Sequence, residues 1–213
     1  MTEANSTAGS VLEPEDEGRL QLYALLARLF AAGPDEQLLR ALAQSAGTIE
    51  GDSELAQAWS ELVAAAADTS AQEATLEFDA TFVGVGRAPV STYMSHYHPG
   101  TRKEAMLVEL RDTLAQLGLA RTATSAEPED NLTALLEVMR HLVAAGSDAQ
   151  SLQRQQEFLA RYLKPAYRGF SDAAHKARLG PFYTAAVRLL ETFMESDLAQ
   201  FEMGRSALSE AGR

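Results

Sequence analysis

The chain has 213 residues, of which 46 % are hydrophobic and 23 % charged, and its formal net charge is −12 with an isoelectric point near 4.8. Such acidity argues against nucleic acid as a partner, because phosphate backbones would be repelled, and it favours the approach of cationic ligands. The absence of cysteine excludes disulfides, thiolate zinc sites and iron–sulfur ligation.

The two ends of the chain are polar. Residues 1–16 are rich in small and acidic side chains, and we expect them to form a disordered tail that is not a secretory signal. Residues 205–213 are expected to form a second polar tail, which leaves an all-helical domain over residues 17–204. No apolar run approaches the roughly 18 residues of a membrane-spanning helix. We therefore expect a cytoplasmic protein without stable membrane insertion.

Apolar residues recur at helical spacing through the first part of the chain. The stripe from Leu22 to Leu29 predicts a first helix, which ends at Gly33. Asp35 is a suitable N-cap for a short second helix. Further helices are predicted around Trp59 and from near Ser70 to Phe82.

The central and C-terminal parts follow the same pattern after an interruption. Residues 83–100 lack a helical period and are interpreted as an ordered loop. Residues 121–127 are small and polar and are interpreted as a linker. No segment alternates with the period of a strand, so we predict an all-α fold: a single domain of about eight helices with an ordered loop crossing the bundle. The later helical stripes cover Leu107–Leu117, Leu132–Val143, Leu152–Ala166 and Phe182–Phe201.

An acidic run directly precedes the stripe that begins at Leu132. It consists of Glu127-Pro128-Glu129-Asp130-Asn131. In one interpretation it is a well-capped helix start, with Pro128 in the first turn and the acids near the positive end of the helix dipole. In the other, Glu127 and Asp130 reach solvent in a groove and bind an arginine, while Asn131 bonds to a peptide backbone.

A second run, Tyr93-Met94-Ser95-His96-Tyr97, lies within the loop. In an extended segment Tyr93, Ser95 and Tyr97 would point to one side, with Met94 and His96 on the other. They would then form either a packed loop that fills gaps between helices or a hydroxyl-lined wall for a peptide. Read together, the two runs predict a protein that holds a basic peptide.

Signatures of catalysis are weak. His96 and His98 form a His-x-His pair, which together with Asp130 leaves a metal-dependent hydrolytic enzyme as a remote alternative. Metal sites require three or four ligands and a second shell, and the sequence offers no further histidine at a ligand spacing. We therefore expect neither a metal nor another cofactor, and a binding protein rather than an enzyme.

The two runs and a third stretch resemble the TorD/DmsD/NarJ family of cytoplasmic chaperones for molybdenum-containing redox enzymes. The family's F-x-G-x-G stretch reads Phe82-Val83-Gly84-Val85-Gly86 here, and its Y-x-S-x-Y loop is the run that begins at Tyr93. Its E-P-x-D-H run is the one that begins at Glu127, with Asn131 in place of the histidine. That replacement removes a titratable group and suggests a branch of the family with a different client.

The resemblance implies an all-helical chaperone that binds the twin-arginine signal peptide of a molybdopterin-containing oxidoreductase subunit until its cofactor is inserted. The residues carried over as peptide-binding are Tyr93, Ser95, Tyr97, Glu127, Pro128 and Asp130, with Asn131 beside them. Three alternatives stay open: a NarJ-like chaperone whose client lacks the arginine pair, the metal-dependent enzyme, and a helical scaffold without a peptide groove. The protein is expected to be a monomer or a domain-swapped dimer.

Overall fold

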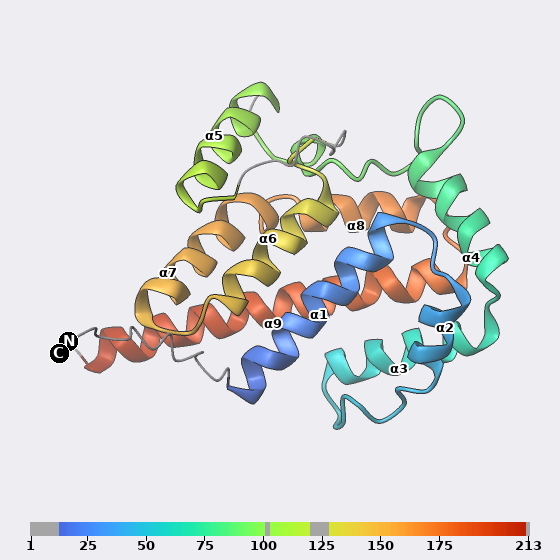
Figure 1. Cartoon of the computed structure of the whole chain (residues 1–213), viewed down its shortest axis with the longest axis horizontal. Coiled ribbons are helices and arrows are strands. Elements are labelled where there is room, and N and C mark those ends of the chain that lie inside the picture. The colour runs from blue at the N-terminus through green and yellow to red at the C-terminus, as the bar shows by residue number, and fades with distance from the viewer. Residues whose placement is uncertain (1–12, 101–102, 120–127, 212–213) are drawn as a thin grey trace, which may run out of the picture.

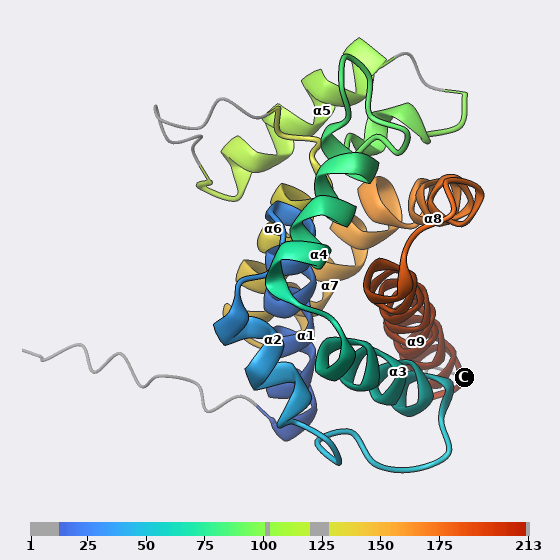
Figure 2. The same cartoon turned by 90° about the vertical axis from the view of Figure 1, so that its right-hand side faces the viewer.

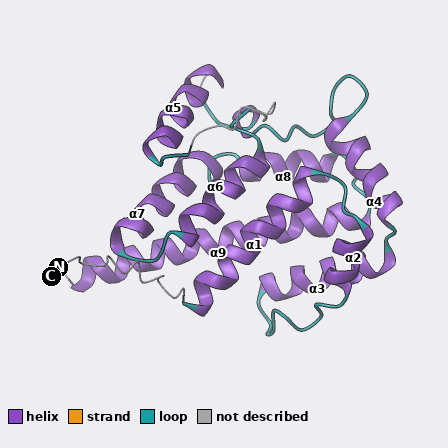
Figure 3. Ribbon diagram, viewed as in Figure 1, coloured by secondary structure: helices purple, strands orange, loops and turns teal. Residues whose placement is uncertain are grey.

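The computed structural model describes residues 13–100, 103–119 and 128–211, with side chains described as far as residue 203. Within these residues the chain forms nine α-helices and no strand, which confirms the predicted all-α fold (Figure 3). The helices are α1 (Pro14–Ala31), α2 (Glu36–Ala43), α3 (Glu54–Asp68), α4 (Ala71–Phe78), α5 (Lys103–Gln116), α6 (Leu132–Ala144), α7 (Ala149–Phe158), α8 (Tyr167–Lys176) and α9 (Pro181–Ala211).

Two helix pairs organise the bundle. The helix α1 packs along α6, and α3 packs along the long helix α9, which runs through the length of the molecule (Figure 1). The helix α5 lies at one end of the bundle, where the loop after α4 also runs (Figure 2), and it buries Met106 and Leu110 in the core. Residues 83–100, which were predicted to form an ordered loop across the bundle, instead run along this edge from α4 to α5 (Figure 1). Among the described residues, no helix has both the length and the hydropathy needed to span a bilayer.

Polar residues at the predicted positions start several helices. The side chain of Asp35 accepts a hydrogen bond from Leu38 N at 2.7 Å and caps α2, which confirms the prediction. Ser53 caps α3 in the same way. Ser70 and Glu73 form a reciprocal capping box at the start of α4. Because each cap satisfies an otherwise unpaired N–H group, these boundaries could be read from the sequence.

A cluster of aromatic rings fills the core where α1, α4, α8 and α9 meet. The ring of Phe30 lies 5.7 Å from that of Phe82 and 5.5 Å from that of Phe170, and the rings of Phe82 and Tyr183 are 5.3 Å apart. Phe82 belongs to a π-helical turn, Asp79–Val83, that directly continues α4. The fourth predicted helix therefore has the expected extent but a wider last turn, and this turn carries the loop away from the core.

Three boundaries differ from the prediction. The helix α1 begins at Pro14, inside the segment assigned to the disordered tail, because proline suits the first turn of a helix and acidic residues follow it there. The helix α9 continues to Ala211, well into the predicted polar tail. The helix α8 was not predicted, because the sequence stripe that follows Leu152–Ala166 is short and contains the buried but polar Ser171.

Candidate functional site

The two sequence runs lie side by side in the structure. Tyr93 and Asn131 form an isolated antiparallel bridge between the loop and the start of α6. Met94 N donates to Asp130 O at 2.8 Å, and Leu132 N donates to Thr92 O at 2.8 Å. Backbone hydrogen bonds of this kind fix the relative position of the two segments. Residues about 35 apart by their numbers are thereby held in one site.

The loop run is a turn and not an extended segment. Met94–His96 forms one turn of 3-10 helix, in which Met94 is fully buried and Ser95 is only 6 % exposed. The expectation that Tyr93, Ser95 and Tyr97 share one exposed side is therefore wrong. Burial of the apolar Met94 side chain and the bond between Ser95 N and Asp130 account for the turn.

The two tyrosines of this run have different roles. The hydroxyl of Tyr97 donates to Ser91 O and accepts from Ser91 N, both at 3.0 Å, and so closes the loop on itself. Burial raises the pKa of Tyr97, against an opposing contribution from the Ser91 hydrogen bond. The ring of Tyr97 packs against Gly169 of α8, where a Cβ would lie 3.0 Å from the Tyr97 Cβ. The ring of Tyr93 instead has the Lys103 ammonium 5.5 Å above it.

Asp130 is fully buried. Its Oδ2 accepts a hydrogen bond from Ser95 N at 3.3 Å, while its Oδ1 has no hydrogen-bond partner among the described residues. The expectation that Asp130 reaches solvent in a groove is therefore wrong. Asp130 is buried because the bridge between Tyr93 and Asn131 turns its side chain towards the loop, where it accepts the hydrogen bond from Ser95 N. The other partner in that expectation, Glu127, lies outside the described residues.

The neighbouring acid, Glu129, is bound within the protein. Arg111 of α5 donates from Nε to Glu129 Oε1 at 3.1 Å and from a terminal nitrogen to Oε2 at 3.2 Å. This two-point contact, followed by the charge of Glu129 and a smaller contribution from Asp130, raises the pKa of Arg111. The acidic run therefore attaches α5 to the start of α6.

The helix α6 starts later than its proline suggested. Asn131 is the N-cap: its Oδ1 accepts from Thr133 N at 3.0 Å, and its Nδ2 donates to Thr92 Oγ1 at 3.2 Å. No acidic residue occupies the first turn, and Pro128 lies in the turn before the cap, where its carbonyl accepts from Asn131 N at 3.2 Å. The helix-start interpretation was thus right for Asn131 and wrong for the placement of Pro128 and the acids.

A cleft of about 720 Å³ opens beside the bridge. Its walls offer aromatic rings, small apolar groups, hydroxyls and one amide, and none of the described residues that line it is acidic. This mixture suits an apolar peptide segment whose backbone bonds to the hydroxyl and amide groups. The lining consists of Phe30, Ala31, Phe78, Phe82, Val83, Gly86, Arg87, Ala88, Ser91, Thr92, Tyr93, His96, Asn131, Thr133 and Ala134.

The glycine-containing stretch shapes one wall of the cleft. Gly84 has a φ of 67°, and a Cβ there would lie 2.6 Å from Arg87 O. Its N–H donates to Asp79 O at 2.7 Å and ends the π-helical turn. Only glycine fits this combination of left-handed backbone and close approach. The turn leaves Val83 exposed at the cleft wall.

The two histidines are engaged in other contacts. The ring of His96 meets the ring of Tyr97 edge-on at 4.9 Å, and His98 Nε2 lies 2.9 Å from Arg161 O. Within the described part of the chain, no group of three histidine, aspartate or glutamate side chains is placed to hold a metal ion.

Of the expected site residues, Tyr93 and Asn131 line the cleft, whereas Ser95, Tyr97, Pro128 and Asp130 support the segments that do. Sequence reasoning missed Thr92 and Thr133, the hydroxyl residues next to each run. Thr92 lies next to the bridge and Thr133 follows the Asn131 cap. Neither position could be recognised from the sequence, because the sequence does not show that the two runs pair.

One family model matches this chain. Its description is nitrate reductase delta subunit, and the match covers residues 50–171, more than half of the chain. The matched segment contains the glycine stretch, the loop run and the acidic run. It therefore contains both partners of the bridge between Tyr93 and Asn131.

Proposed function

The chain belongs to the nitrate reductase delta subunit family, and from this premise we propose that it is a maturation chaperone for a molybdenum-containing oxidoreductase. In this proposal the cleft beside α6 holds an N-terminal segment of the catalytic subunit in the cytoplasm. The segment is released after the cofactor has been inserted. The chaperone binds its client without chemical turnover.

The observation that carries the proposal is the bridge between Tyr93 and Asn131 at the edge of the cleft. It places an aromatic ring and an amide from two separate motifs on the same wall. Thr92 and Thr133 add hydroxyl groups close by. An extended or helical peptide would bury apolar side chains against the exposed Val83 and bond its backbone to these polar groups.

The lining of the cleft favours one kind of client segment. An arginine pair would require carboxylates, yet none of the described lining residues is acidic and Arg87 is among them. Asp130 is buried and Glu129 is bound to Arg111. We therefore propose that the cleft reads the apolar part of the segment. An arginine pair, where a client has one, contributes mainly through the long-range attraction of a chain with net charge −12.

A variant that fills the cleft tests the proposal. Ala134→Phe places a ring in the cleft wall, whereas Ala67→Phe adds the same ring to the exposed face of α3. Binding is measured by calorimetry with synthetic N-terminal peptides of molybdoenzyme catalytic subunits. We expect at least about tenfold weaker binding for Ala134→Phe, or ~1.4 kcal/mol, and wild-type binding for Ala67→Phe. Equal affinities for both variants would exclude the cleft as the binding site.

The role of an arginine pair is tested on the peptide. Replacing both arginines by glutamine should reduce the dependence of affinity on salt concentration while leaving most of the affinity at about 0.15 M salt, where the Debye length is about 8 Å. Complete loss of binding would instead identify the arginines as the recognised feature. In that case a carboxylate outside the described lining would have to bind them.

A further inference from the structure

A second groove lies at the opposite end of α1 from the cleft. It has a volume of about 780 Å³ and is formed by the start of α1, the start of α7 and the C-terminal part of α9. About 11 to 16 residues of α1 separate the two sites, which corresponds to roughly 20 Å of helix. The groove is lined by Glu15, Asp16, Arg19, Ala149, Leu152, Gln153, Gln156, Gln200, Phe201 and Met203.

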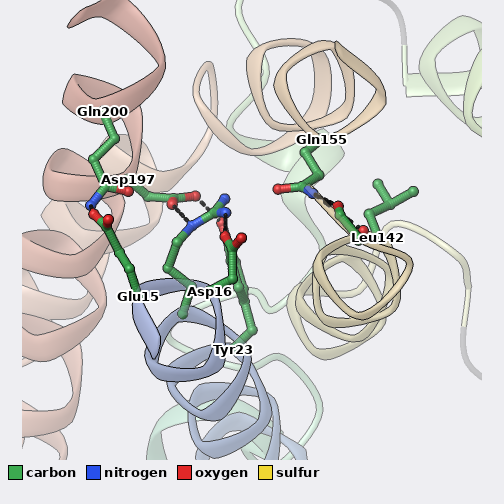
Figure 4. Close-up of polar contacts among 9 residues, drawn as sticks. Glu15, Asp16, Tyr23, Leu142, Gln155, Asp197 and Gln200 are labelled. Carbon is green, nitrogen blue, oxygen red and sulfur yellow. Dashed lines mark hydrogen bonds and ion pairs between the residues drawn. The ribbon is translucent and has the colours of Figure 1, made fainter. Parts of the chain in front are cut away.

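A buried arginine forms the polar floor of this groove. Arg19 is only 7 % exposed, and its Nε donates to Asp197 Oδ1 at 2.6 Å while Nη1 donates to Asp16 at 2.8 Å. Tyr23 donates its hydroxyl to the other oxygen of Asp197 (Figure 4). Burial acts to lower the pKa of Arg19, but the charge and hydrogen bond of Asp197 outweigh it and the pKa is raised. The guanidinium therefore stays charged and fixed in place.

One nitrogen of the Arg19 guanidinium makes no hydrogen bond with the described residues. This nitrogen, Nη2, is buried. An unpaired buried donor costs stability, so an acceptor that reached this nitrogen when its covering side chains moved aside would gain free energy by pairing with it. An anionic acceptor would be repelled, because three carboxylates already surround the single positive charge of Arg19. They belong to Glu15, Asp16 and Asp197. A neutral carbonyl oxygen, such as that of a peptide bond, fits this site.

The rim of the groove combines acids with exposed apolar side chains. Glu15 of α1 accepts from Gln200 Nε2 of α9 at 2.7 Å, and Figure 4 shows this pair beside Asp197. Leu152 of α7 and Met203 of α9 are exposed, and Met203 is 65 % accessible to solvent. Phe201 covers the Arg19 guanidinium at 5.2 Å from its ring centre.

We propose that this groove is a second docking site, which takes a basic amphipathic peptide segment. The apolar side chains of the segment pack on Leu152, Phe201 and Met203, and its lysines or arginines lie near Glu15 and Asp16. A backbone carbonyl of the segment accepts a hydrogen bond from Arg19 Nη2 after the side chains that cover this nitrogen have moved aside. A second copy of this chain is disfavoured as the occupant because both copies carry net charge −12.

The test uses a fluorescein-labelled synthetic amphipathic helix of lysine and leucine, titrated with the full chain and followed by anisotropy. The double variant Leu152→Gln/Met203→Gln removes the apolar rim, and its control Leu76→Gln changes a leucine that is 61 % exposed on α4, away from the groove. Glu15→Gln removes a rim charge, and its control Glu17→Gln removes an exposed charge from the same helix outside the groove lining.

We expect the double variant to weaken binding at least tenfold and Glu15→Gln about threefold, while both controls bind as the wild type does. Ala134→Phe, which fills the cleft, should also leave this binding unchanged. Equal affinities of the groove variants and their controls would mean that the peptide does not bind at this groove, and would overturn the proposal.

Two other occupants give distinct results. If the groove joined two copies of this chain, sedimentation velocity would show a dimer that the double variant converts to a monomer. If residues 1–12 of the same chain covered the groove, deleting them would strengthen binding of the labelled helix several-fold. Either result would overturn the proposal of an external basic segment.

Discussion

The carboxylate of Asp130 illustrates how one buried group can organise a site that it does not line. It accepts the N–H of Ser95 across the two runs, while its second oxygen has no partner among the described residues. A buried carboxylate with so few hydrogen bonds costs stability. Holding the loop against α6, so that Tyr93 stays at the cleft, is a role that fits its position.

Substituting Asp130 separates its hydrogen bond from its charge. Asp130→Ala leaves the buried Ser95 N–H without an acceptor and should lower the free energy of unfolding by about 1–3 kcal/mol. Asp130→Asn keeps an acceptor oxygen without the charge and should lower it by less than half as much. Urea denaturation measures both, with the exposed Asp52→Ala as control. Equal losses for Asp130→Ala and Asp130→Asn would show that the charge is the stabilising feature.

The Asn131 side chain makes two hydrogen bonds with Thr92 and Thr133 that can be removed one at a time. Asn131→Ala loses both the cap of α6 and the bond to Thr92, and should cost about 1–2 kcal/mol of stability. Asn131→Asp keeps the oxygen that caps α6 but loses the N–H donor to Thr92. We expect Asn131→Asp to retain most of the stability in thermal melts and to weaken peptide binding in calorimetry. Unchanged peptide affinity would argue against a role of the Thr92 bond in the cleft.

At the scale of an element, the glycine stretch joins a π-helical turn to the cleft wall. Gly84→Ala introduces a Cβ at 2.6 Å from Arg87 O in a left-handed conformation, whereas a Cβ added at Gly86, where φ is 91°, would meet only open space. Gly86→Ala therefore bears only backbone strain of about 1 kcal/mol. Gly84→Ala should cost clearly more in urea denaturation. Equal costs would mean that the loop moves away without penalty.

The start of α9 depends on a carboxylate from α4. Tyr183 N donates to Glu77 Oε1 at 3.0 Å, and burial raises the pKa of Glu77 against the opposing hydrogen bonds from Tyr183 and Gly180. A raised pKa means that the folded state binds this proton more tightly than the unfolded state. The contribution of Glu77 to stability is therefore greatest below the unfolded pKa of about 4.3 and is lost as the pH rises through the folded value.

A neutral replacement makes that dependence measurable. Glu77→Gln removes the titration, so the melting temperature of the variant relative to the wild type should increase as the pH rises from about 4 to about 7. The exposed Glu50→Gln, between α2 and α3, is the control and should show no such trend. A difference that decreases over the same pH range would mean that the ionised carboxylate is the stabilising form at the start of α9.

For the whole molecule, sequence periodicity predicted the helices because each buries one apolar stripe. It could not predict the candidate site in detail. The runs at 93–97 and 127–131 were identified by their residue types, but their bridge is made by backbone groups that every residue carries. The burial of Asp130 follows from that bridge. Arg19 is similarly unpredictable, because its buried partner Asp197 is 178 residues away along the chain.

That long separation has a consequence for how the protein is made. The helix α9, which leaves the ribosome after the other described helices, packs against α1, α3, α4 and α8, and it supplies Asp197 and Tyr183 to the core. Helices synthesised earlier therefore expose apolar faces until α9 arrives, and domains with such non-local contacts fold more slowly than those with local ones. The protein therefore completes its folding only after α9 has been synthesised.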